Sequence, residues 1–106
     1  MENCMFKIKS DPTFEANIVI VGQGREQTLV VTFKHMPRSD YSDLLQKTAD
    51  GKLASEELVL KLVEKWNADA ELSKANIKLL CDQQPGADWA IITAYSEALA
   101  VARKGN

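Results

Sequence analysis

Apolar and polar residues alternate on both sides of a glycine-rich turn, and this pattern constrains the fold more than any other feature of the chain. Before the turn, residues 14–21 follow the period of two that is typical of a half-buried strand. The turn, Gly22-Gln23-Gly24, contains two glycines, which adopt the backbone conformations that tight turns require. Residues 28–33 follow it and are rich in β-branched and aromatic side chains. We therefore expect a β-hairpin.

Each arm of the expected hairpin has one mainly apolar face. Side chains alternate between the two faces of a strand, so one side of the sheet receives Phe14, Ala16, Ile18, Ile20, Leu29, Val31 and Phe33. Three valines fall on the opposite side, namely Val19, Val21 and Val30. An apolar strip there either binds a partner or is covered by a helix of the same chain, and the sequence leaves both interpretations open. On the first interpretation, these valines are the candidate partner-binding residues.

Residues 4–8 are the candidate for a third strand. They read Cys-Met-Phe-Lys-Ile and precede Asp11-Pro12. An isolated two-stranded hairpin is only marginally stable in water, so a further strand would help the sheet to form. We therefore expect an N-terminal strand beside the hairpin.

After Pro37 the apolar period changes from that of strands to that of helices. The expected helices start near Ser39, Ser55, Ser73 and Ala87, and they end near Asp50, Trp66, Gln84 and Arg103. Because the strands come first and the helices afterwards, we expect an α+β fold. In this fold a small antiparallel sheet, the hairpin plus the N-terminal strand, is covered on one face by about four helices.

Length and charge indicate the broad class of protein. The chain has 106 residues, and we expect residues 1–106 to form a single domain. Thirteen Lys and Arg against 15 Asp and Glu give a net charge of -2, which does not favour nucleic acid as a partner. The apolar runs fall far short of the roughly 20 residues that span a bilayer, and the N-terminus lacks the pattern of a secretory signal. We therefore expect a cytoplasmic protein that binds neither membrane nor nucleic acid.

Few residues could carry catalysis or bind a metal. His35 is the only histidine, and the two cysteines, Cys4 and Cys81, lie far apart and outside any Cys-x-x-Cys pair. The sequence Gly22-Gln23-Gly24-Arg25 lacks the Lys-Ser or Lys-Thr of a phosphate-binding loop. We expect no catalytic residue, no metal site and no cofactor. A small enzyme that pairs His35 with a cysteine is kept as an alternative.

Two segments carry a family resemblance. Residues 29–38 read Leu-Val-Val-Thr-Phe-Lys-His-Met-Pro-Arg and lead into a helix with Leu44-Leu45. Residues 66–95 run from a tryptophan through an acidic turn to Leu79-Leu80, then through Gln-Pro-Gly-Ala to Ala-Ile-Ile-Thr-Ala-Tyr. In this order they resemble the phage tail assembly chaperones, the minor tail assembly proteins of long-tailed phages and prophages. Residues 4–8 match nothing in that pattern.

The resemblance implies a chaperone and not an enzyme. Such a protein would bind the tape-measure protein transiently in the host bacterial cytoplasm and keep its amphipathic helices soluble during tail assembly. Tail-tube subunits are a further implied partner, and no cofactor is implied. An unrelated small cytoplasmic protein-binding adaptor or regulator is the alternative. Self-association is also expected, because a sheet edge and an outer apolar strip would both be open.

Overall fold

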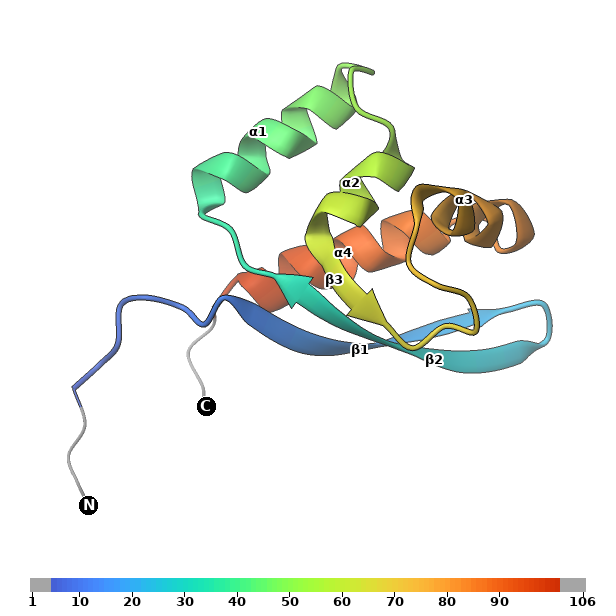
Figure 1. The fold of residues 1–106 in the computed structure, drawn as a ribbon, viewed down its shortest axis with the longest axis horizontal. Helices are drawn as coiled ribbons and strands as arrows, with labels where there is room; N and C mark the ends of the chain where they lie inside the picture. Colours follow the sequence, from blue (N-terminus) through green and yellow to red (C-terminus); the bar gives the residue numbers. More distant parts are fainter. Residues whose placement is uncertain (1–4, 102–106) are drawn as a thin grey trace.

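The computed structural model describes residues 5–101 and places all of its helices on one side of a small sheet (Figure 1). Along the chain, the elements are β1 (Thr13–Gly22), β2 (Arg25–Lys34), α1 (Arg38–Ala49), α2 (Ser55–Leu62), β3 (Val63–Trp66), α3 (Lys74–Gln83) and α4 (Ala87–Leu99). The three strands are antiparallel, in the order β1-β2-β3. The predicted α+β fold, with helices on one face of an antiparallel sheet, is confirmed.

The hairpin is the element that the sequence predicted most closely. β1 and β2 pair along their whole length, from Thr13 opposite Lys34 to Gly22 opposite Arg25. The turn between them has two residues, Gln23 and Gly24, with φ angles of 56° and 75°. Two successive left-handed residues are typical of a type I′ turn, whose twist matches that of the flanking strands.

The third strand is not the one that the sequence predicted. Residues 5–8 form no strand, and Cys4 lies outside the described residues. β3 takes that place instead and pairs with the last part of β2, with Val31 opposite Trp66. The expectation of a helix up to Trp66 was therefore also wrong, since α2 ends at Leu62 and the backbone is extended at Val63.

Most helix starts were predicted within one or two residues. Ser73 caps α3 as expected, because its hydroxyl oxygen accepts the N–H of Asn76 at 3.1 Å. Two expected caps were displaced, since Pro37 precedes α1 and Ala54 precedes α2. The last helix is shorter than predicted: α4 ends at Leu99 and the backbone is extended at Ala100. The expected end at Arg103 lies outside the described residues.

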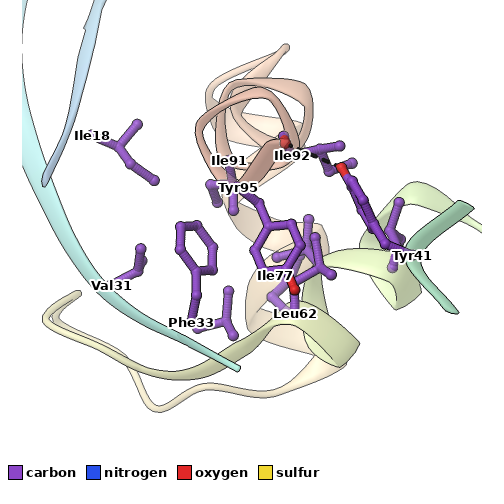
Figure 2. Close-up of a cluster of buried hydrophobic side chains, with 12 residues drawn as sticks. Ile18, Val31, Phe33, Tyr41, Leu62, Ile77, Ile91, Ile92 and Tyr95 are labelled. Carbon is purple, nitrogen blue, oxygen red and sulfur yellow. Dashed lines mark hydrogen bonds between the residues drawn. The ribbon is translucent and has the colours of Figure 1, made fainter. Parts of the chain in front are cut away.

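The core fills the space between the inner face of the sheet and the helices (Figure 2). Tyr95 of α4 lies at its centre, with its ring 5.0 Å from that of Phe33 and 4.9 Å from that of Tyr41. Its hydroxyl donates a hydrogen bond to the carbonyl of Lys34 at 2.8 Å. Burial, with a smaller effect of Tyr41, raises the pKa of Tyr95 to about 12. The completely or almost completely buried hydrophobic residues come from β2, β3, α2, α3 and α4, and include Val31, Phe33, Leu58, Val59, Leu62, Val63, Ile77, Ile91 and Tyr95.

Candidate protein-binding surfaces

The side of the sheet away from the helices is the first candidate surface, and we call it the outer sheet face. The alternation of the paired strands assigns to it Glu15, Asn17, Val19 and Val21 of β1, Glu26, Thr28, Val30 and Thr32 of β2, and Lys65 of β3. Val19 is 53% exposed and Val21 is 72% exposed, whereas Val30 is half-buried. All the helices lie on the opposite side (Figure 1). Among the described residues, no helix covers the valine strip.

The three valines form a continuous strip across two strands. Thr28 lies directly opposite Val19, and Val30 lies opposite Asn17, so Val30 is a diagonal neighbour of Val19. Charged groups flank the strip, with Glu26 opposite Val21 and Lys65 opposite Thr32. A flat apolar strip with a charged border can receive the apolar side of another polypeptide.

A groove of about 510 Å³ on the helix side is the second candidate surface. It lies between the turn end of the hairpin, the loop that follows β3, and α3. Its apolar lining residues are Ile20, Leu29, Trp66, Ala68, Ala70, Leu79 and Leu80, and its polar ones include Arg25, Gln27, Asn76 and Gln83. The side chain of Gln23 donates a hydrogen bond to the carbonyl of Gln83 at 2.7 Å, which joins the hairpin turn to the end of α3.

The groove was not predicted from the sequence. Trp66 is half-buried on its wall and donates its ring N–H to the carbonyl of Ala70 at 2.8 Å. Leu79 is 52% exposed and belongs to no buried stripe of α3. The one sequence signal for this surface is that Leu79 falls outside the apolar stripe of Ile77, Leu80 and Cys81. It becomes informative only once the hairpin is placed next to α3.

A cluster of Glu56, Cys81 and Asp88 joins three helices, with its potential ligand atoms within 4.8 Å of one another. Asp88 is 9% exposed, and its two carboxylate oxygens accept hydrogen bonds from the hydroxyl of Ser55 and from the N–H of Trp89. Burial and the nearby Asp88 raise the pKa of the Cys81 thiol, which favours its neutral form. These contacts tie the start of α2 to the start of α4, and they account for the cluster as a structural feature.

The remaining chemistry-bearing residue is His35. Its backbone N–H donates to the carbonyl of Pro12 at 2.9 Å, and it follows the end of β2 that lies away from α3, the helix with Cys81 (Figure 1). The described residues therefore do not join His35 and Cys81 into a catalytic pair, and Cys4 lies outside them. None of the helices within residues 5–101 has the length and hydropathy to cross a membrane.

A family model described as phage tail assembly chaperone matches residues 1–106. The matched range includes both segments that carry the resemblance, residues 29–38 and 66–95. No curated protein and no solved structure matches the chain.

Proposed function

The chain belongs to the phage tail assembly chaperone family, and on that premise we propose that it binds the tape-measure protein transiently and keeps it soluble while the tail is built. It would do so in the host bacterial cytoplasm, by binding and not by catalysis. Tail-tube subunits are a second proposed partner. The observation that supports this proposal is the uncovered valine strip of the outer sheet face, where Val19 and Val21 are more than half exposed.

The chemistry of the strip suits reversible binding of an amphipathic helix. Complete burial of an exposed valine contributes roughly 1.5 kcal/mol, so the remaining exposed area of Val19 and Val21 would contribute less than that at each site. Each contribution is modest, and association itself has a cost. The contact is therefore weak and reversible, as a chaperone that must later leave its partner requires.

The flanking charges would orient the partner more than they would hold it. Glu26 and Lys65 are exposed, and exposed ion pairs contribute little to affinity while they affect the rate and the register of association. We therefore assign the affinity to the valines and the orientation to the two charged borders. On this proposal, the outer sheet face receives the apolar stripe of a helix, and the polar side of that helix stays in water.

The proposal is tested by co-expression of the chain with the tape-measure protein encoded beside it. We expect the tape-measure protein to become soluble and to copurify with the wild-type chain, and a Val19→Asp/Val21→Asp variant to lose both effects. Val101→Asp is the matched control, because Val101 is 96% exposed but lies after α4 and not on the sheet. Tail-tube subunits are tested in a parallel co-expression.

The experiment tests the identity of the partner and the position of the binding surface separately. If the wild-type chain neither solubilises nor binds the tape-measure protein, the chaperone proposal for this partner fails and an adaptor for another protein becomes the better hypothesis. If the double variant binds as well as Val101→Asp does, the partner is correct and the outer sheet face is not its site.

A further inference from the structure

The side of β2 that faces the groove has an unpaired stretch of backbone. β3 pairs with β2 only over Val31 to Phe33. One position further on, the N–H of Asn67 donates to the carbonyl of Val30 at 3.1 Å, and the N–H of Val30 donates to the side-chain oxygen of Asn67 at 2.9 Å. Beyond Val30, no described strand lies beside β2 on this side.

The groups on this open edge can be identified from the alternation of a strand. Because the N–H and C=O of Val30 bond to Asn67, they point away from β1. Backbone groups alternate in direction along a strand, so those of Thr28 and Glu26 point the same way, towards the groove. The open edge therefore offers donors and acceptors for one more extended segment, in line with β3 and next to the apolar lining of the groove.

The described N-terminal residues form a segment that fits such an edge. Met5, Phe6 and Ile8 are 92%, 91% and 90% exposed, and none of them belongs to a helix or strand. In an extended conformation, Phe6 and Ile8 share one side, and Lys7 and Lys9 share the other. Beside β2, the first pair would enter the groove near Leu29 and Leu79, and the lysines would lie on the side of Glu26.

This segment cannot reach the groove of its own chain. It precedes β1, whereas the groove is lined by the turn end of the hairpin, the loop after β3 and α3. Figure 1 shows the turn and α3 at the opposite end of the hairpin from the start of β1. The chain from Ile8 to Thr13 spans at most about 17 Å, whereas Val19, the partner of Thr28 on the open edge, is about 20 Å along the strand from Thr13. The segment would also have to cross the sheet. The groove that this segment fills must therefore belong to another molecule.

We propose that residues 5–9 of one copy add as a strand to the open edge of β2 in a second copy, with Phe6 and Ile8 in the groove. Reciprocal exchange between two copies closes the assembly as a dimer. Strand addition of this kind combines backbone hydrogen bonds with alternate side chains in pockets. Lys7 and Lys9 against Glu26 complete the match of charge on the outer side.

Sedimentation of the full chain from micromolar to submillimolar concentration tests the proposal. We expect the wild type to form dimers, and a Phe6→Ser/Ile8→Ser variant to weaken dimerisation at least about tenfold. Met5→Ser is the matched control, because Met5 is equally exposed but lies on the side of the lysines. In a Trp89→Phe background, the emission of Trp66 on the groove wall should change with protein concentration. This change should be absent when Phe6→Ser and Ile8→Ser are added to the same background.

Variants of the groove test the second half of the contact. Thr28→Pro removes an N–H of the open edge that β1 does not use, and proline is tolerated at a strand edge. If circular dichroism shows that this variant does not fold, Leu79→Gln serves instead, with Lys78→Gln on the same helix as its control. We expect Thr28→Pro, or Leu79→Gln in its place, to be monomeric at concentrations where the wild type and Lys78→Gln are dimeric.

Two results would overturn the proposal. One is a wild-type chain that stays monomeric over the whole concentration range. The other is a dimer that survives both the Phe6/Ile8 double variant and the groove variant, since the contact would then lie on another surface such as the outer sheet face.

Discussion

The two ends of the β-hairpin differ in what surrounds them. At the end where β1 begins and β2 finishes, the sheet has three strands, and Phe14 and Phe33 pack on Tyr95 with ring centroids 5.6 and 5.0 Å away. At the turn end the sheet has two strands, and the residues from Val21 to Thr28 are all exposed. The first end is built for stability, and the second leaves backbone and side chains free for partners.

A chain of this size can thus combine a stable core at one end of the hairpin with an open surface at the other. The net stability of a domain is a few kcal/mol, so the core must hold the fold without help from the binding surfaces. The aromatic cluster concentrates the packing at one end, and the hairpin carries the other end outward as a two-stranded extension. Substitutions at the two ends should therefore have very different costs.

Phe33→Ala should have the largest effect. Phe33 is completely buried between β1, β3 and α4 and contacts the rings of Phe14 and Tyr95. Truncation of a buried phenylalanine costs about 3–5 kcal/mol, which is enough to unfold a marginally stable domain. Val21→Ala at the turn end should cost less than about 0.5 kcal/mol. Urea unfolding followed by circular dichroism measures both, and equal costs would remove the distinction between the two ends.

Tyr95→Phe should have an intermediate effect that depends on pH. The variant loses the hydrogen bond to the carbonyl of Lys34, at a cost of about 1–2 kcal/mol. The pKa of Tyr95 is raised to about 12, so folding favours the neutral phenol. The stabilisation is fully present below the unfolded pKa near 10 and is lost as the pH rises towards 12. Unfolding free energies between pH 9 and about pH 12 should fall more steeply in the wild type than in the variant.

A control for that experiment is available in the same cluster. Ser96→Ala removes the hydroxyl that bonds to Tyr41, without changing the phenol of Tyr95. Its unfolding free energy should keep the steep wild-type slope at high pH. A slope that is equal in the wild type and in Tyr95→Phe would show that other groups cause the loss of stability.

The hairpin and its two faces could be predicted because side chains alternate along a strand. The side of one residue therefore fixes the side of all the others. Once Phe14 faces the core, Val19 and Val21 must face outward, and the register with Phe33 opposite Phe14 fixes β2 as well. The same argument failed at β3. Val63 is buried in the strand, and it would also have been buried on the apolar stripe of a longer α2, so the pattern could not show where the helix ends.

The candidate surfaces divide in the same way. The valine strip follows from local alternation and was visible in the sequence, although what binds it is a proposal. The groove joins the hairpin, the loop after β3 and α3, which are separated in the chain by up to tens of residues. No local sequence pattern indicates that these segments lie next to one another. The hydrogen bond between Gln23 and Gln83 shows how far apart the two sides are in the sequence.

Gly24→Ala should have a smaller effect than Phe33→Ala and Tyr95→Phe, and it tests the turn end directly. Gly24 has a φ of 75°, which an alanine adopts only with strain, while no heavy atom outside Gly24 and its two chain neighbours lies within 4 Å of the position of an added Cβ. The cost of about 1 kcal/mol is therefore conformational and not steric. Gly22→Ala is the matched control, because Gly22 has no positive φ and equal space, and it should cost nothing. The turn end carries both candidate surfaces and little of the core. Gly24→Ala should therefore reduce the free energy of partner binding or of dimerisation by more than it reduces the free energy of unfolding. Thermal unfolding and sedimentation of the same samples would show this.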